Sequence, residues 1–262
     1  MPLGTRVILV LHPDHRVHAV VRDAARHAVV SALDDWQALH KALLVTPPST
    51  VGVVDPYFAS QEPGPSPELH ALLMRVPSAS LIPALEITPE SASDLALLDA
   101  WGTAGFISTG HDDTPAAIAS RLADACLLPL KRLLAATLPA DASPNAYTLL
   151  FAAADAICHG GNATDLATAL QASPSTLLRW CEEAGLPTPR TLLQWVRVLL
   201  ATCLLAEPAR TPDAVARACG YASRAELRRV TQRLLGQTPV QLRSDGFAHA
   251  SACFLRSLPL PR

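Results

Sequence analysis

The stretch from residue 211 to residue 243 limits what this chain can fold into more than any other part of it. Thr211 provides a hydroxyl cap, and the proline and aspartate that follow it suit the first turn of a helix. Gly220 supplies the left-handed residue that commonly ends a helix. Ser223, with a glutamate three residues later, has the spacing of a capping box. We therefore expect a short helix, a tight turn and a second helix that ends at Gly236.

The second of these helices has two faces of opposite character. Its apolar residues recur at helical spacing, namely Leu227, Val230, Leu234 and Leu235. Its other face carries four arginines beside one acid, namely Arg224, Arg228, Arg229, Arg233 and Glu226. Two short helices joined by a glycine turn, the second rich in arginine, are typical of a helix-turn-helix motif that binds DNA.

The details of this region point to one family. The run from Ala216 to Arg243, with Cys-Gly-Tyr after the first helix and Gly-x-Thr-Pro after the second, resembles the signature of AraC/XylS-type transcription regulators. Members of that family carry two helix-turn-helix units joined by one long helix, so the resemblance implies a second unit upstream. Residues 162–171 and 173–183 match its two helices, and residues 189–206 match the connecting helix.

The resemblance also implies which side chains contact DNA. These are Ser175, Thr176 and Arg179 in the first recognition helix, and Arg224, Ala225, Arg228 and Arg229 in the second. We expect Arg179 and Arg229 to matter most, because arginine binds guanine edges bidentately and also pairs well with phosphate. Which of these residues contact bases and which contact phosphates is left open.

The connecting helix has a suitable length. Its 18 residues span about 27 Å at roughly 1.5 Å per residue. Successive major grooves lie about 34 Å apart, so one chain could place its two recognition helices in neighbouring grooves.

The chain departs from the family at three positions. Thr231 and Cys181 stand where the recognition helices usually carry a core phenylalanine, and Leu227 stands where an aromatic residue is common. The first two changes remove apolar volume, so we expect them to affect local stability rather than the fold.

The N-terminal half has a different pattern. Five short apolar runs predict strands at 6–11, 28–33, 50–54, 80–85 and 105–107. Helices are expected between and after them, at about 15–26, 36–44, 67–75, 91–101 and 115–135. This alternation predicts a flavodoxin-like α/β domain, with a five-stranded parallel sheet covered on both faces. Pro83 is a misfit within its strand, and a bulge or a position at the sheet edge would explain it.

An α/β unit of this kind ahead of a DNA-binding domain resembles the receiver domain of response regulators. The resemblance implies that Asp55, at the carboxyl end of the third strand, could be a phospho-acceptor. The other site positions depart from the family: His12 stands in place of a magnesium-binding acid pair, Glu86 in place of Thr or Ser, and Thr109 where a lysine is usual. Phosphoryl transfer needs cations to offset negative charge, so we predict a receiver-like domain that has lost its phosphorylation switch. Alternatively, Asp55 caps the next turn, or the chain is a genuine phosphorylation-dependent response regulator.

These patterns predict four segments. They are a receiver-like domain at 1–135, a linker at 136–146, a double helix-turn-helix domain at 147–243 and a tail at 244–262. The tail has no clear pattern: either Phe247, Phe254 and Leu255 pack one more helix onto the helix-turn-helix domain, or the tail is mobile. Residues 146–262 hold 12 arginines against eight acids, a net charge of +4, whereas residues 1–145 hold nine basic residues against 15 acids, a net charge of −6. The asymmetry indicates that only the C-terminal half meets nucleic acid.

Other functional classes find little support. We expect no catalytic site and no cofactor, because no phosphate-binding glycine loop and no hydrolase nucleophile motif occurs. His12, His15 and His18 recur every three residues, but a solvated helix start explains them better than a metal site. The six scattered cysteines favour a reduced, cytoplasmic protein. We expect no signal peptide and no membrane span, since the most apolar stretch, 192–206, is short and contains an arginine.

Together these observations predict a DNA-binding transcription regulator that is not an enzyme. Its partner would be double-stranded DNA, read through the major groove. The N-terminal domain would form a homodimer, sense a small molecule or contact a protein. The remaining alternative is an interaction protein that does not bind DNA.

Overall fold

The computed structural model describes residues 6–259, with the exception of residues 62 and 113. The chain divides into two compact units, which we call the α/β unit (residues 6–129) and the helical unit (residues 130–259). Among the residues described, no helix is both long enough and apolar enough to cross a membrane.

The α/β unit contains a five-stranded sheet whose paired strands are all parallel, in the order β2-β1-β3-β4-β5. Its strands are β1 (Val7–Leu11), β2 (Val29–Ala32), β3 (Val51–Val54), β4 (Ser80–Leu85) and β5 (Ile107–Ser108). Its helices are α1 (His15–Ala24), α2 (Trp36–Val45), α3 (Pro67–Arg75), the 3₁₀ turn η1 (Pro89–Ser91), α4 (Ala92–Ala100) and α5 (Pro115–Ala125). This strand order is that of flavodoxin-like folds, so the predicted fold class is confirmed.

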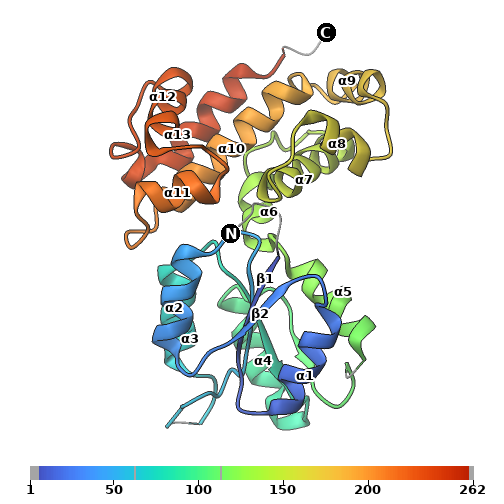
Figure 1. Ribbon diagram of the computed structural model, residues 1–262, viewed down its shortest axis with the longest axis vertical. Coiled ribbons are helices and arrows are strands. Elements are labelled where there is room, and N and C mark those ends of the chain that lie inside the picture. The colour runs from blue at the N-terminus through green and yellow to red at the C-terminus, as the bar shows by residue number, and fades with distance from the viewer. Residues whose placement is uncertain (1–5, 62, 113, 260–262) are drawn as a thin grey trace. The chain divides into compact units, whose positions relative to one another are not determined.

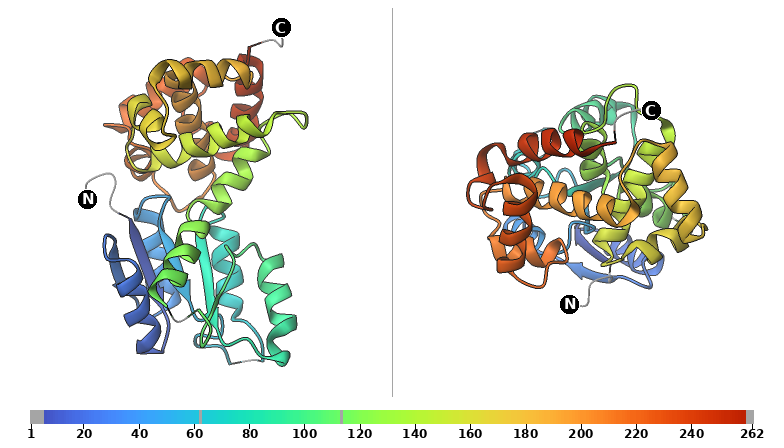
Figure 2. Two further views of the ribbon diagram at one scale, coloured as in Figure 1. Left: turned by 90° about the vertical axis from the view of Figure 1, so that its right-hand side faces the viewer. Right: turned by 90° about the horizontal axis from the view of Figure 1, so that it is seen from above.

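Helices cover both faces of this sheet (Figure 2). On one face, Leu9 and Leu11 of β1 belong to a buried cluster with Leu39 of α2 and Leu69 of α3. Helices α1 and α5 pack together, and Ile8 lies on the opposite side of β1, beside Val51 of β3. Strands buried on both faces need apolar residues at every position, and all five residues of β1 are buried.

Pro83 lies inside β4, opposite Val54 of β3, so neither a bulge nor an edge strand accounts for it. The backbone of Leu81 and Leu85 faces β5, because their carbonyl oxygens accept from Ala104 N and Thr109 N. The backbone N–H and C=O groups of every second residue of a strand point toward the same neighbouring strand, so the backbone of Pro83 also points toward β5. Pairing between β4 and β5 begins only at Ala84. Proline lacks a backbone N–H, and at Pro83 this donor would point toward residues that precede the paired part of β5.

The predicted helix at 115–135 is wrong in one respect, because the structure divides it into α5 and α6 (Leu128–Ala135). Leu127 lies between them with a φ of 62°. A left-handed residue cannot continue a right-handed helix, and leucine in this position is strained. Sequence periodicity missed the break because the apolar spacing continues through it.

The helical unit is built around one long helix, α10 (Pro189–Leu205), which packs against α7 and α13 (Figure 1). Most of α6 also belongs to this unit, and the remaining helices are α7 (Pro144–Cys158), α8 (Ala163–Ala169), α9 (Pro174–Glu183), α11 (Pro212–Ala218), α12 (Arg224–Leu235) and α13 (Leu242–Ser257). Of the 17 residues of α10, 13 are buried, which explains why its sequence is apolar on almost every side.

The helical unit extends beyond both bounds of the predicted helix-turn-helix domain, 147–243. Helix α7 begins at Pro144, inside the predicted linker, and it buries seven residues. Helix α13 occupies most of the predicted tail, in agreement with the alternative of one more packed helix there. Its Phe254 is fully buried, with its ring 5.8 Å from that of Trp195 on α10. The tail lacked a clear apolar period, because α13 contains a kink at Asp245 and contacts α10 partly through a glycine, Gly246.

Candidate nucleic-acid interface

The start of α12 is formed by its own side chains. Ser223 Oγ accepts a hydrogen bond from Glu226 N at 3.2 Å, and Glu226 Oε2 accepts one from Ala222 N at 2.7 Å. The spacing of Ser223 and Glu226 predicts a capping box, in which Glu226 would accept from Ser223 N. The serine half is present, but Glu226 bonds to Ala222 N, one residue before the cap. The helix ends at Gly236, which has a φ of 70°. One consequence is that the only acid of α12 is held at the backbone, next to the helix N-terminus.

The outward face of α12 is strongly basic. Its four arginines are all exposed, namely Arg224, Arg228, Arg229 and Arg233. Within the described part of the chain, no carboxylate lies within 4.0 Å of any of them. Four arginines and one glutamate leave α12 with a net charge of +3.

A shallow hollow runs along this face. Five residues line it, namely Ala225, Arg228, Arg229, Gln232 and Arg233. Three of these are among the predicted contacts, whereas Gln232 and Arg233 are additional. Both could have been found from the sequence, since they lie four residues after Arg228 and Arg229 and so extend the same helix face.

The first recognition helix, α9, has a different charge. Ser175 and Arg179 are exposed and Thr176 is half-buried. Arg179 Nε lies 3.6 Å from Glu183 Oε1. With Glu182 and Glu183 against one arginine, α9 has a net charge of −1. The two recognition helices therefore offer unequal attraction to a phosphate backbone.

Helix α10 connects the two helix-turn-helix units. Its 17 residues span about 25 Å at roughly 1.5 Å per residue, close to the predicted length. It packs against α8 and α9 as well as against α11. Side chains of α10 therefore belong to the core of both helix-turn-helix motifs, which limits the motion of one motif relative to the other.

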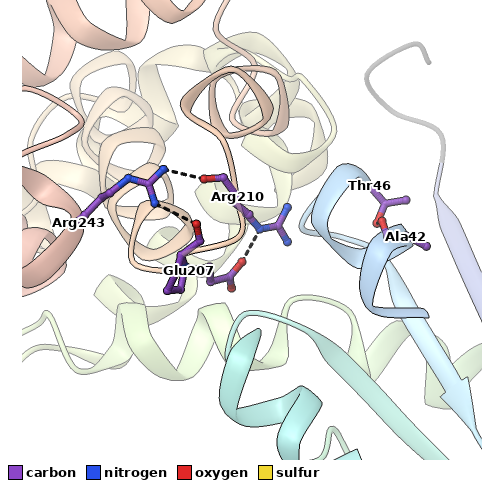
Figure 3. Close-up of polar contacts among 6 residues, drawn as sticks. Ala42, Thr46, Glu207, Arg210 and Arg243 are labelled. Carbon is purple, nitrogen blue, oxygen red and sulfur yellow. Dashed lines mark hydrogen bonds and ion pairs between the residues drawn. The ribbon is translucent and has the colours of Figure 1, made fainter. Parts of the chain in front are cut away.

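Charged side chains hold the segment after α10 (Figure 3). Glu207 and Arg210 form a buried ion pair. Arg243 Nη2 donates to Arg210 O at 2.8 Å, and its Nη1 donates to Pro208 O at 3.4 Å. Arg243, the last residue of the run that resembles the AraC/XylS signature, thus positions the loop that leads into α11. Hydrogen bonds from a charged donor are stronger than neutral ones.

The turn of the second unit is fixed by an aromatic residue. Tyr221 follows Gly220 and is buried, and Arg197 of α10 lies 5.8 Å from the centre of its ring. Burial raises the pKa of the Tyr221 hydroxyl. The Gly-Tyr pair of the sequence pattern thus has separate roles: the glycine adopts a φ of 72° and the tyrosine packs against the connecting helix.

The three departures from the family pattern are all buried. Thr231, Cys181 and Leu227 are fully buried. Thr231 Oγ1 donates to Arg228 O at 3.1 Å, so its hydroxyl is satisfied within its own helix. A polar group can replace a larger apolar one at such a site because the buried hydroxyl has a partner.

The carboxyl edge of the sheet holds the residues of the receiver comparison. Leu11 pairs with Val54, so His12 and Asp55 follow neighbouring strands at the same level. Asp55 Oδ1 accepts a hydrogen bond from Tyr57 N at 2.9 Å. This geometry fits the interpretation of Asp55 as a strand-end cap.

His12 is tied into the backbone. Its Nδ1 accepts from Asp14 N at 3.0 Å, and its Nε2 lies 3.3 Å from Ala84 O. Burial lowers the pKa of His12 despite the nearby Asp55 carboxylate. A neutral ring that donates through Nε2 satisfies both contacts, whereas the resemblance implies an acid at this position.

Neighbouring side chains complete this edge. Tyr57 OH donates to Asp94 Oδ2 at 2.9 Å, and burial together with this carboxylate raises the pKa of Tyr57 to about 12. Glu86 follows β4 and is exposed, and Thr109 follows β5. His18 Nε2 donates to His12 O at 2.6 Å. Among the described residues, no group of three or more His, Cys, Asp or Glu side chains is placed to bind a metal ion.

A known protein family matches part of the helical unit. Residues 166–245 match a family model described as a helix-turn-helix domain. No curated protein matches the sequence. Among solved structures, the chain is similar to the RcsB response regulator of Salmonella typhimurium, with 15% identity and a TM-score of 0.34 over 74% of this chain and 99% of that one.

Two further solved structures are similar to this chain. Full-length FixJ from B. japonicum shares 16% identity with a TM-score of 0.34, over 89% of this chain and 98% of that one. The xylose-binding transcription activator xylR shares 14% identity with a TM-score of 0.38, over 92% of this chain and 70% of that one.

The matched residues extend from α8 to the start of α13 and include both recognition helices. Their order, the side-chain caps at Ser173, Thr211 and Ser223, and the glycines that end α9, α11 and α12 agree with those expected from the sequence. Residues 166–245 therefore form a helix-turn-helix domain of the type that AraC transcription regulators carry.

Proposed function

We propose that this chain is a sequence-specific DNA-binding transcription regulator in which α9 and α12 enter neighbouring major-groove segments. The observation that carries the proposal is the arginine face of α12. Its four exposed guanidinium groups have no carboxylate within 4.0 Å among the described residues. Such a face attracts phosphates and can present bidentate donors to guanine.

A purely solvated helix face accounts less well for this arrangement. Exposed helix faces usually mix charges of both signs, because like charges four residues apart repel. On α12, Arg224 and Arg228 have this spacing, as do Arg229 and Arg233. Keeping them together costs stability, which favours a partner of opposite charge.

The contacts that we assign to DNA follow from exposure and position. They are Ser175, Thr176 and Arg179 on α9, and Arg224, Ala225, Arg228, Arg229, Gln232 and Arg233 on α12. Because α9 has a net charge of −1 and α12 of +3, α12 would supply most of the electrostatic attraction. Ser175 and Thr176 would then contribute mainly hydrogen bonds.

For the α/β unit we propose the role of a pseudo-receiver. His12 engages backbone atoms at the position where a magnesium-binding acid is expected, and Glu86 adds negative charge to the same edge. Such an edge is poorly suited to a phosphorylated carboxylate. Incubation with Mg²⁺ and acetyl phosphate should therefore give no mass gain on Asp55. A gain that Asp55→Asn abolishes would favour the phosphorylation-dependent alternative.

Dimerisation through the α/β unit is part of this proposal. Two weakly binding domains gain affinity when they are joined, since the second binding event becomes intramolecular. Mass measurement in solution at micromolar concentration checks this point, and a monomeric mass there would contradict it.

Selection of bound DNA from a random pool tests the DNA-binding function itself. The wild type should enrich a motif that spans two successive major grooves, and the double variant Arg179→Ala/Arg229→Ala should lose it. Arg256→Ala removes one exposed arginine from α13 and serves as the control. No enrichment at low salt would contradict the proposal.

A further inference from the structure

The α/β unit contains a cavity that the DNA-binding function does not use. It has a volume of about 310 Å³. It lies at the amino ends of β1 and β3, away from the edge that holds His12 and Asp55. Its walls come from the end of α1, the turn into β2, the start of β3 and the second half of α5.

The strand register explains the apolar floor of the cavity. Ile8 and Val51 are paired neighbours on β1 and β3, and both are buried. Side chains two apart on a strand share a face, so Arg6 projects on the same side as Ile8. Leu122 and Ala119 of α5 form the opposite wall. Small side chains leave the space open, since alanines line it at 24, 25, 28 and 119.

The rim of the cavity is basic. Arg6, Arg26 and His27 are exposed and line it beside one acid, Asp23. Arg26 Nε donates to the backbone oxygen of Asp23 at 3.2 Å. This bond uses Nε, so the two terminal nitrogens of the guanidinium group are further donors. Within the described chain, no carboxylate lies within 4.0 Å of Arg6 or Arg26.

We propose that this cavity binds a small organic acid, with its apolar body against Ile8, Val51 and Leu122 and its carboxylate at the Arg6–Arg26 rim. Ligand sites combine mostly apolar walls with a few polar groups that fix orientation, and this lining has that composition. Arginine is well suited to the carboxylate, because its planar donors match both oxygens.

The volume limits the size of the ligand. Ligand pockets in proteins have volumes of roughly 300–1,000 Å³, so a cavity of about 310 Å³ suits a small ligand. Phenylacetate, with ten non-hydrogen atoms, and hexanoate, with eight, are suitable probes. Their neutral amides have nearly the same shape and lack the charge, so each acid has a matched control.

Calorimetric titration of the full chain with the four compounds tests the proposal. Both acids should bind saturably, and each amide should bind at least fivefold more weakly. Arg6→Gln and Arg26→Gln should each reduce acid affinity about fivefold or more. No saturable binding of either acid, or amides that bind as well as acids, would overturn the assignment.

A pair of alanine variants locates the site independently. Ala119→Leu fills the cavity from α5 and should abolish binding, whereas Ala116→Leu adds the same side chain at an exposed position of the same helix and should leave binding unchanged. Leucine is a good helix former, so neither change disturbs α5 itself. Undiminished binding by Ala119→Leu would place the ligand elsewhere and refute the proposal. These titrations contain no DNA, so their outcome is separate from that of the DNA selection.

Discussion

Replacing Arg229 by alanine separates a DNA-reading role of α12 from a structural one. Arg229 is exposed, lines the hollow on α12 and has no carboxylate within 4.0 Å in the described part of the chain. Its removal therefore breaks no internal ion pair. Surface changes of this kind alter the free energy of unfolding by about 0.5 kcal/mol or less, so any large effect on DNA binding arises at the interface.

The expected loss of DNA affinity follows from the contact. A bidentate arginine–guanine pair contributes about 1–3 kcal/mol of discrimination. At about 1.4 kcal/mol for each tenfold change, this corresponds to a loss of roughly 5- to 150-fold. Fluorescence anisotropy with the selected DNA and with single-base variants measures it between 50 and 300 mM salt.

The pattern of the loss identifies the type of contact. If Arg229 reads a base, the loss is large on the selected site and small on a site changed at one position. If it contacts a phosphate, affinity falls uniformly and the slope of log K against log salt becomes shallower by about 0.9. Arg256→Ala, on α13, should change neither quantity. Binding by Arg229→Ala within twofold of wild type on every sequence would refute the assignment of α12 as a recognition helix.

Three other changes test separate parts of the structure. Glu183→Gln should raise DNA affinity several-fold, measured by anisotropy, because it removes an acid from α9 and releases Arg179 from its 3.6 Å pair; unchanged or weaker binding would contradict this. Gly246→Val should lower the free energy of unfolding by about 1–3 kcal/mol in urea, because a Cβ there would lie 2.9 Å from a side-chain atom of the preceding turn; exposed Ser244→Val is the control, and equal stability of the two variants would count against tight packing. Because burial lowers the pKa of His12 below its ordinary value of 6.5, the folded state binds protons at His12 less readily than the unfolded chain does. The contribution of His12 to stability is therefore present above pH 6.5 and is lost as the pH drops below that value. Urea titrations at pH 5.5 and 7.5 measure this difference, which His12→Gln should reduce; an unaltered difference would argue against it.

Much of the helical unit could be predicted because its signals are local. Ser223 and Gly236 mark the two ends of α12, and a cap or a left-handed turn depends only on residues within one helical turn. Helix α7 was missed for the opposite reason. Its apolar residues are mainly alanines and leucines with little periodic contrast, so only its burial within the unit identifies it.

For the predicted site residues, too, local spacing accounts for most of what the structure shows. Exposure of Arg224, Arg228 and Arg229 follows from their position opposite the apolar face of α12. Arg179 and Glu183 are four residues apart, so their ion pair could have been predicted from the sequence. The prediction that Arg179 contacts DNA did not take this pair into account. Gln232 and Arg233 line the same hollow as Arg228 and Arg229, and their spacing of four residues from these arginines could have placed them on this face from the sequence.

By itself, the sequence determined the class of each unit, the alternation of strands and helices from β1 to α5, and the arginine face of α12, because hydrophobic period, caps and glycine turns act over a few residues. Only the tertiary structure decided the break at Leu127, the docking of α13 on α10, the contacts of His12 with distant backbone atoms and the cavity between α1 and α5. Those features depend on which surfaces meet when segments far apart in the chain pack together, and no local pattern encodes that.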